Sequence, residues 1–185
     1  MPITPESIYN DYRNKLLDRN SASTLLISMI ENSKNEVIRV KCIEIIQRIE
    51  DQDNKLFKFL ENLLISDLNE TVRIAAFEAI KKLFTKKAVG PVKYAIDKEK
   101  SHFLIELMEF LSIMDPFICR EIITNKIKNT KDPFFKEKLF NQKIERFKLK
   151  DLKELYSEYL FNNSLEDLYF HRRKIPFAVD LFYLD

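Results

Sequence analysis

Residues 35–49 read Asn-Glu-Val-Ile-Arg-Val-Lys-Cys-Ile-Glu-Ile-Ile-Gln-Arg-Ile, and residues 69–83 read Asn-Glu-Thr-Val-Arg-Ile-Ala-Ala-Phe-Glu-Ala-Ile-Lys-Lys-Leu. The two copies start 34 residues apart, are identical at five positions, and mostly exchange one apolar residue for another elsewhere. A period of about 20–50 residues is typical of one supersecondary unit stacked on copies of itself. The echo therefore predicts a repeat architecture, but it does not identify a partner.

The scarcity of glycine decides the fold class. Gly90 is the single glycine in 185 residues, although β-hairpins and tight α/β loops use glycine wherever φ is positive. The chain is 45% apolar and rich in Leu, Ile, Lys and Glu, which are compatible with helices. We therefore expect an all-α fold. Its predicted helices cover residues 5–19, 22–32, 36–50, 54–66, 70–85, 87–97, 101–114, 116–128, 133–147, 149–161 and 165–173.

Capping signals mark most of the predicted helix boundaries. Three sites place an N-cap residue before a proline at the first helical position, where the missing N–H of proline costs nothing. These sites are Thr4-Pro5, Asp115-Pro116 and Asp132-Pro133. Further N-cap candidates are Asn35, Asp53, Asn69 and Ser164. Because the predicted connections are only about two to five residues long, neighbouring helices are expected to be antiparallel.

Apolar residues within the two copies follow the spacing of a buried helical stripe. In the predicted helix 36–50 the stripe consists of Val37, Val40, Ile43, Ile46 and Ile49. In the predicted helix 70–85 it consists of Val72, Ala75, Ala76, Ala79, Ile80 and Leu83. The alanines of the second copy predict close approach between helices.

We expect a single domain over residues 1–185. Residues 1–34 would form N-terminal capping helices, residues 35–147 the repeats, and residues 148–185 a divergent aromatic C-terminal cap. Two interpretations of this last region stay open: a segment folded back over the last repeat, or a continuation beyond the given sequence. Its aromatic residues either pack or anchor a partner, and the strongest anchors would be Tyr169, Phe177, Phe182 and Tyr183.

The two copies resemble the second helix of a HEAT repeat, with a polar cap, then arginine, then small residues, then a spaced apolar pair. Residues 87–96 similarly resemble a HEAT first helix, including its proline. The family usually has Asp where this chain has Asn35 and Asn69, an exchange that preserves capping. The resemblance implies a right-handed α-solenoid of about five antiparallel HEAT-like helix pairs that acts as a scaffold or adaptor.

Arg39 and Arg73 occupy the same position in the two copies. One interpretation is a basic row along a binding groove. The other is a brace between repeats, in which each arginine holds a carboxylate or the carbonyls of the preceding helix. We favour repeat bracing, because both arginines belong to the repeat pattern itself.

A protein or peptide partner follows from the predicted architecture, because stacked second helices would line a curved surface whose outward positions carry specificity. The outward positions of the two copies are Lys41, Glu44, Arg48, Glu78, Lys81 and Lys82. This ridge of mixed charge suits an acidic or amphipathic segment of a partner.

A nucleic-acid-binding solenoid is the alternative. Residues 126–155 carry ten Lys or Arg against five acids, residues 171–174 read His-Arg-Arg-Lys, and Lys81, Lys82, Lys86 and Lys87 form a third group. Aligned along one face, these groups could form a basic stripe that displaces counterions from a phosphate backbone. The competing and favoured interpretation is an ordinary solvated surface with acids interleaved.

Catalytic and metal-binding motifs are not evident in the sequence. His102 and His171 lie far apart, and neither stands at nucleophile–base spacing from a Ser, Cys or paired carboxylate. Cys42 and Cys119 are too few and too distant for a disulfide framework or a metal site. We therefore predict no enzyme, no cofactor and no small-molecule substrate. Without a signal peptide or an apolar run of about 18 residues, the expected location is cytoplasmic, with no membrane span.

Overall fold

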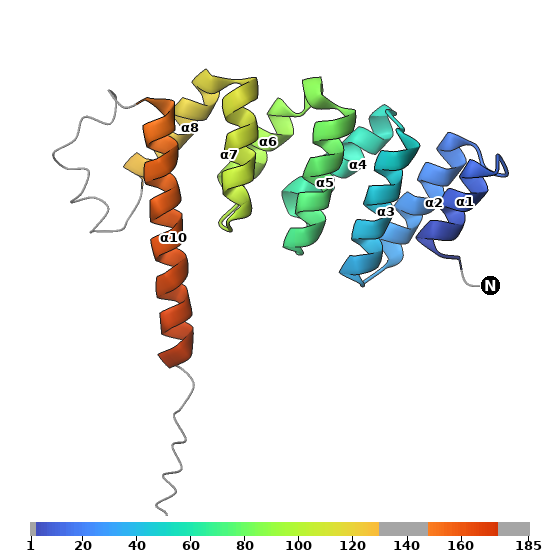
Figure 1. The fold of residues 1–185 in the computed structure, drawn as a ribbon, viewed down its shortest axis with the longest axis horizontal. Coiled ribbons are helices and arrows are strands. Elements are labelled where there is room, and N and C mark those ends of the chain that lie inside the picture. The colour runs from blue at the N-terminus through green and yellow to red at the C-terminus, as the bar shows by residue number, and fades with distance from the viewer. Residues whose placement is uncertain (1–2, 130–147, 174–185) are drawn as a thin grey trace, which may run out of the picture. The chain divides into compact units, whose positions relative to one another are not determined.

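The computed structural model describes the backbone of residues 3–129 and 148–173, and within these ranges every regular element is a helix (Figure 1). The chain divides into two compact units, Met1–Met114 and Asp115–Asp185. The expected all-α class is therefore confirmed for the described residues. The prediction of one domain over residues 1–185, with its three subdivisions, stays a prediction.

The first unit consists of short helices joined by short connections. They are α1 (Pro5–Arg13), α2 (Arg19–Asn32), α3 (Glu36–Ile49), α4 (Asn54–Ser66), α5 (Glu70–Leu83), α6 (Val89–Lys98) and α7 (Phe103–Met114), with a 3-10 turn η1 (Thr85–Lys87) between α5 and α6. The predicted helix 5–19 is wrong at its C-terminal end. The backbone turns at Lys15, which has a φ of 61°, and Asp18 then caps α2 by accepting a hydrogen bond from the Ser21 N–H.

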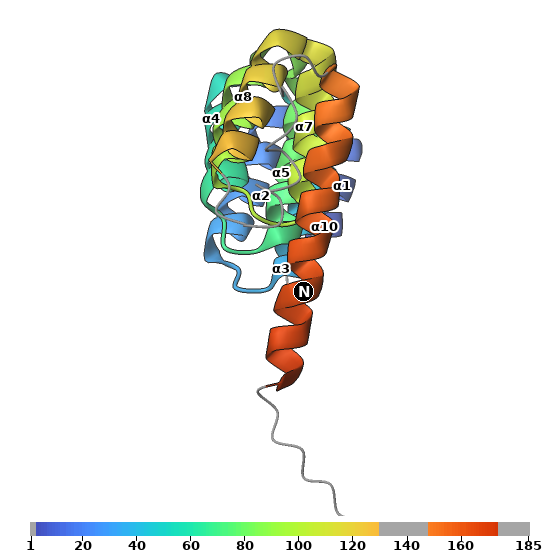
Figure 2. The same ribbon diagram turned by 90° about the vertical axis from the view of Figure 1, so that its left-hand side faces the viewer.

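Helices of the first unit pack in two layers (Figures 1 and 2). Consecutive helices form the antiparallel pairs α2–α3, α4–α5 and α6–α7. Helices two apart also touch, with α1 against α3 and α3 against α5 in one layer and α4 against α6 in the other. The pair α4–α5 therefore packs against both neighbouring pairs, through α5 against α3 and through α4 against α6.

The helix starts of the two copies are built alike. The side chain of Asn35 accepts hydrogen bonds from Val37 N and Ile38 N, and that of Asn69 accepts them from Thr71 N and Val72 N. These bonds satisfy N–H groups that have no partner inside the helix. The predicted caps at Thr4 and Asp115 are also confirmed. Asp53 occupies the N-cap position of α4 but makes no side-chain capping bond.

The core of the first unit contains the predicted stripe of α5, but of the predicted stripe of α3 only Ile43, Ile46 and Ile49 are buried, and Val40 is half-buried. In α3 the buried residues are Cys42, Ile43, Ile45, Ile46 and Ile49, and in α5 they are Val72, Ala75, Ala76, Phe77, Ala79, Ile80 and Leu83. Val37 was wrongly assigned to the stripe: it is 69% exposed, because it lies in the first turn at the edge of the layer. Phe77 meets the rings of Phe103 and Phe110 edge to face at 5.6 and 5.5 Å.

The second unit contains α8 (Pro116–Lys128) and α10 (Leu149–Arg173), which pack against each other. Its described core is apolar and consists of Cys119, Ile122, Ile123, Ile127, Leu152, Leu155 and Tyr156. The predicted break between helices 149–161 and 165–173 is wrong, since α10 runs through Ser164 without interruption. A serine within a helix can satisfy its hydroxyl locally, so a capping pattern alone does not end a helix. The predicted helix 133–147 and its Asp132-Pro133 cap lie outside the described residues.

Candidate functional site

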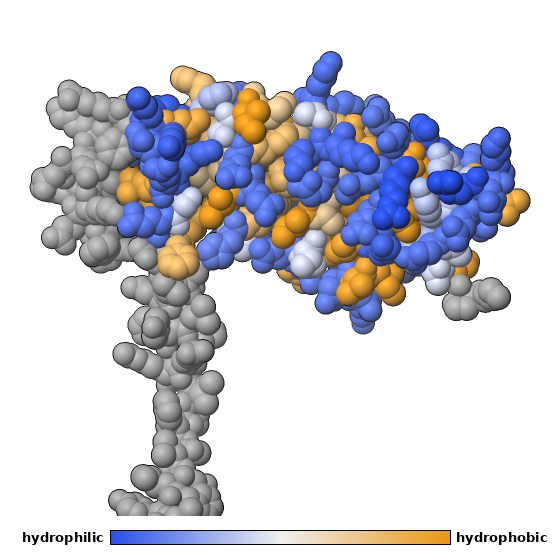
Figure 3. Space-filling view, in the orientation of Figure 1, coloured by the Kyte–Doolittle hydropathy of each residue, from blue (hydrophilic) through white to orange (hydrophobic). Residues whose placement is uncertain are grey.

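The six residues predicted to bind a partner lie on two helices that pack side by side. Lys41, Glu44 and Arg48 are on α3, and Glu78, Lys81 and Lys82 are on α5. Lys82 Nζ donates to the Gln47 carbonyl oxygen at 3.1 Å, which joins the two helices near their C-terminal ends. In the space-filling view, hydrophilic side chains cover much of the layer that contains α3 and α5 (Figure 3). We call these six residues the charged ridge.

Four residues of the charged ridge form ion pairs within their own helices. Lys41 Nζ lies 3.2 Å from Glu44 Oε2, and Lys81 pairs with Glu78 in the same i,i+3 arrangement. Lys81 also stands over the Phe77 ring, with Nζ at 5.1 Å from its centroid. Exposed pairs of this kind contribute only about 0–1 kcal/mol to folding, so these charges stay available to a partner.

Arg48 and Lys82 are the exposed cations of the ridge that have no carboxylate partner. Arg48 makes no hydrogen bond or ion pair with any residue that the structure describes, and Lys82 donates only to a main-chain oxygen. In the alignment of the two copies they occupy the same position. Two unneutralised charges on neighbouring helices give the ridge its positive end.

Arg39 and Arg73, the two residues predicted to brace repeats, both make ion pairs. Arg39 Nη1 donates to Asp67 Oδ1 at 3.2 Å, and Arg39 Nη2 pairs with Asp67 Oδ2. Arg73 Nε and Nη2 donate to the two carboxylate oxygens of Glu99 at 2.9 and 3.2 Å. The carboxylates are almost fully buried, with side-chain exposures of 6% for Asp67 and 7% for Glu99. We call these four residues the ion-pair ladder.

Both carboxylates of the ladder stand at the C-cap of a helix. Asp67 follows α4 and Glu99 follows α6, and each also accepts the backbone N–H two residues further on, from Asn69 and Ser101 respectively. The same carboxylate therefore organises the loop of its own hairpin and holds the arginine of the preceding second helix. Ladder contacts thus link α3 to the α4–α5 connection, and α5 to the α6–α7 connection.

Arg73 makes a further contact that joins the two ion pairs into one series. Its Nη1 donates to the carbonyl oxygens of Asp67 at 3.0 Å and Leu68 at 3.3 Å. The sequence predicts acceptors on the preceding helix, and these two carbonyls lie in the connection directly after it. Ion pairing to a carboxylate that comes later in the chain was not expected, and Asp67 and Glu99 were missed. The available signal was an acid two residues before a polar residue whose side chain accepts a backbone N–H at the start of the next helix, in Asp67-Leu-Asn69 and Glu99-Lys-Ser101.

The pKa of Glu99 lies below its ordinary value of 4.5. Burial acts in the opposite direction and would raise it. Hydrogen bonds from Arg73 and from the residues Lys100 and Ser101 favour the carboxylate and outweigh burial. Glu99 is therefore an ionised partner of Arg73 over the neutral pH range, and its free energy of ionisation is coupled to folding.

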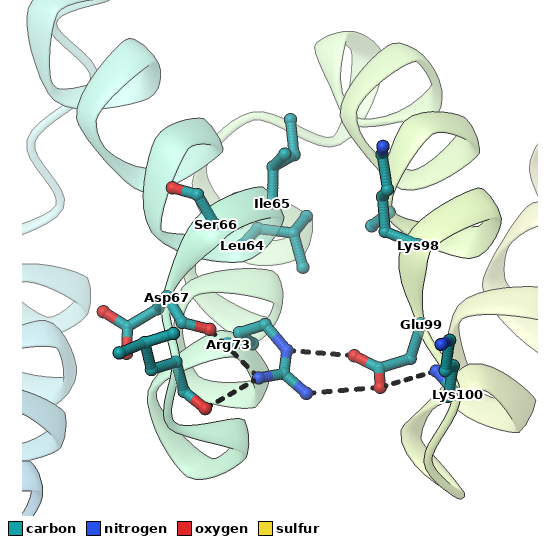
Figure 4. A pocket seen from close by; sticks show the side chains of 10 residues that line it. Leu64, Ile65, Ser66, Asp67, Arg73, Lys98, Glu99 and Lys100 are labelled. Atoms are coloured by element: carbon teal, nitrogen blue, oxygen red, sulfur yellow. Dashed lines mark hydrogen bonds and ion pairs between the residues drawn. The ribbon is translucent and has the colours of Figure 1, made fainter.

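A pocket of about 320 Å³ opens beside the Arg73–Glu99 pair (Figure 4). It lies between the C-terminal ends of α4 and α6, and Arg73 reaches into it from α5. The lining residues include Leu64, Ile65, Leu68, Ala95, Lys98 and Lys100. No sequence pattern pointed to this pocket, because its residues come from three helices that are separated along the chain.

The basic groups proposed for nucleic acid are only partly described. Lys87 Nζ donates to Asn54 Oδ1 at 2.5 Å and stands over the rings of Phe57 and Phe84. Much of the basic stretch 126–155, and the side chains of 171–174, lie outside the described residues. Of the C-terminal aromatics, Tyr156 is buried, burial raises its pKa to about 12, and Phe161 is exposed. The proposed anchors Tyr169, Phe177, Phe182 and Tyr183 lie outside the described side chains.

Reactive groups do not gather in the described structure. Cys42 and Cys119 are buried, and burial raises the pKa of each thiol to about 11, which disfavours the nucleophilic thiolate. His102 is exposed, and the side chain of His171 lies outside the described residues. Among the residues that the structure describes, no three His, Cys, Asp or Glu side chains are placed to hold a metal ion.

Comparison with known proteins found no matching family model, curated protein or solved structure. Within the described ranges, no helix is both long enough and apolar enough to cross a membrane.

Proposed function

We propose that this protein is a non-catalytic scaffold or adaptor built from HEAT-like helix pairs in a right-handed α-solenoid. Its partner would be a protein or peptide, bound along the charged ridge of α3 and α5. The observation that carries the proposal is that Arg48 and Lys82 lie at equivalent positions of adjacent helices and that neither has a carboxylate partner among the described residues. A cytoplasmic location belongs to the same proposal.

Recurrence of the local contacts supports the HEAT-like part of the proposal. Ser33, Asp67 and Ser101 are spaced by 34 residues, and each side chain accepts the backbone N–H two residues later. Asn35 and Asn69 cap helices at the same spacing. Repeat proteins are stabilised by such units and by the interfaces between neighbouring units, which leaves their outward side chains available for binding.

An acidic or amphipathic segment is the partner chemistry that fits the ridge. Arg48 and Lys82 offer unneutralised positive charge, while Lys41 and Lys81 can exchange their intrahelical carboxylates for those of a partner. Complementary charge mainly raises association rates and selects among partners. Stable binding would additionally need buried contacts near the centre of the interface.

The test is a triple reversal, Arg48→Glu, Lys81→Glu and Lys82→Glu, compared with the wild-type chain in affinity capture from nuclease-treated native extract. We expect recovery of the wild-type partner to fall at least about tenfold, because energetically important interface residues cost upward of about 1–2 kcal/mol each when they are lost. The matched control reverses three exposed cations of the other layer, Arg19→Glu, Lys55→Glu and Lys93→Glu. Equal recovery with both triple variants would remove the ridge from consideration.

The nucleic-acid alternative is separated by a direct measurement. The wild-type chain is titrated with a generic DNA duplex and a generic single strand at low and high salt. A polyanion-binding surface would give affinity that falls steeply as salt rises. Such affinity, lost in the ridge variant, would favour the alternative over a protein partner.

A further inference from the structure

The pocket between α4 and α6 is lined by a small residue of α6, Ala95. Ala95 stands four residues before the C-cap Glu99, where α4 has Leu63 four residues before the C-cap Asp67. Ala95, Leu64 and Ile65 all line the pocket, and of the three only Ile65 is more than slightly exposed. Leu68, which also borders the pocket, is fully exposed at 100%. The apolar surface that a ligand can reach in this pocket therefore comes mainly from Ile65 and the exposed Leu68.

Charged groups in the wall of this pocket are already satisfied. All three nitrogens of Arg73 donate hydrogen bonds, two to Glu99 and the third to the carbonyls of Asp67 and Leu68. Glu99 in turn accepts from Arg73 and Lys100 N (Figure 4), and also from Ser101 N. A ligand therefore meets a fixed, neutral polar wall rather than a free charge that it must neutralise.

The rim of the pocket is positive. Lys98 and Lys100 are exposed, and the ammonium groups of both have no carboxylate partner among the described residues. The one contact found for the Lys98 ammonium within the described residues is with the Tyr94 ring, whose centre lies 5.7 Å from Nζ. The C-terminal ends of α4 and α6 contribute about half a negative charge each. The two positive charges of the lysines exceed this sum.

We propose that this pocket docks a leucine-sized side chain of a partner peptide whose flanking residues are acidic. The volume of about 320 Å³ lies within the range of small-molecule sites, so the pocket has room for one leucine side chain together with the peptide backbone beside it. The carboxylates on either side would reach Lys98 and Lys100. This site lies at the N-terminal end of α5, whereas Arg48 and Lys82 lie at the C-terminal ends of their helices, so it is separate from the charged ridge.

The experiment uses the full chain labelled with ¹⁵N and the probe peptide acetyl-Asp-Asp-Leu-Asp-Asp-amide. We expect the amide signals of Leu68, Lys98 and Lys100 to shift during titration. Replacing the leucine of the peptide with serine should weaken binding at least about tenfold, since burial of a leucine supplies most of the gain. Replacing its aspartates with asparagines should weaken binding about threefold or more, as expected for exposed charge pairs.

Two variants of the protein make the assignment specific. Ala95→Leu fills the hollow and should abolish the shifts, while Leu68→Ser removes the exposed edge without touching the core and should weaken binding several-fold. Lys58→Ser is the matched control, because Lys58 is exposed and lies in the first turns of α4, away from the pocket. The proposal is overturned if the leucine and serine peptides bind equally. It is also overturned if both pocket variants bind the leucine peptide like the control, or if the shifts map to another surface.

Discussion

Arg39 and Arg73 stand 34 residues apart at the same position of two sequence copies, yet their surroundings differ. Arg39 meets Asp67 through its two terminal nitrogens, and its buried Nε has no hydrogen-bond partner among the described residues. Arg73 meets Glu99 through Nε and Nη2, and its remaining nitrogen donates to two carbonyl oxygens. One copy therefore leaves a buried nitrogen without a hydrogen bond, and in the other all three guanidinium nitrogens donate.

The difference follows from the acid that each arginine meets. Asp67 lies two residues before Asn69. Its short carboxylate accepts a hydrogen bond from Asn69 N, which holds it close to the loop. Glu99 is one methylene longer and reaches the side of the guanidinium while still accepting from its own loop. Identical residues in a repeat can thus contribute unequally, because the partners lie outside the repeated motif.

The largest expected effect comes from removing each arginine. Arg73→Met should lower the free energy of unfolding by about 3–5 kcal/mol, because it leaves the buried Glu99 carboxylate unpaired. Arg39→Met should cost less, about 1–3 kcal/mol, because it also removes a buried N–H that lacked a partner. Urea unfolding followed by circular dichroism at neutral pH measures both losses.

Lys93→Met serves as the control for the arginine variants, since Lys93 is an exposed cation on α6 and should change stability by less than about 0.5 kcal/mol. A loss for Arg39→Met that equals or exceeds that for Arg73→Met would contradict the proposed difference between the two ion pairs.

Acid should weaken the Arg73 ion pair in a defined pH window. The pKa of Glu99 in the folded protein lies below its ordinary value of 4.5, so the unfolded chain takes up the proton first as pH falls. The stability that this group contributes is therefore complete above about pH 5 and is lost as pH falls through the folded-state pKa. Glu99→Gln should flatten the decline of unfolding free energy over that window.

Glu106→Gln provides the comparison for the acid experiment, because Glu106 is exposed on α7. It should leave the slope of stability against pH close to that of the wild-type chain. If Glu99→Gln and Glu106→Gln gave the same slope, Glu99 would not be the group that couples folding to acid.

Much of the fold was predictable because local physics sets it. Asn35 and Asn69 cap helices as their positions in the repeat indicated, and the near absence of glycine correctly predicted helices alone for the described residues. The failures also have local causes. Helix 5–19 ended early because the chain reverses at Lys15, and Ser164 did not begin a helix because α10 continues through it.

The ladder and the pocket were harder to predict, because they depend on contacts between segments 26 to 28 residues apart. The sequence indicated that Arg39 and Arg73 matter to the repeat, but not which carboxylates they meet. Likewise, the significance of Ala95 emerges only when α6 lies beside α4, so that this small residue lines the pocket. Short-range patterns specify helices and caps, whereas pairings across hairpins need the packed structure.

The smallest expected effect concerns how the two copies end. Helix α3 ends at Glu50 in the left-handed region, with a φ of 55°, whereas α5 ends at Phe84 with a φ of −133°. A glycine adopts the left-handed conformation without steric cost, so Glu50→Gly should raise the free energy of unfolding by about 0.5–1 kcal/mol.

Gln52→Gly is the control, because Gln52 is exposed in the same connection and has no positive φ. It should lower stability slightly by adding freedom to the unfolded chain. Urea midpoints that move in the same direction for both variants would show that chain entropy, rather than the left-handed cap, governs this connection.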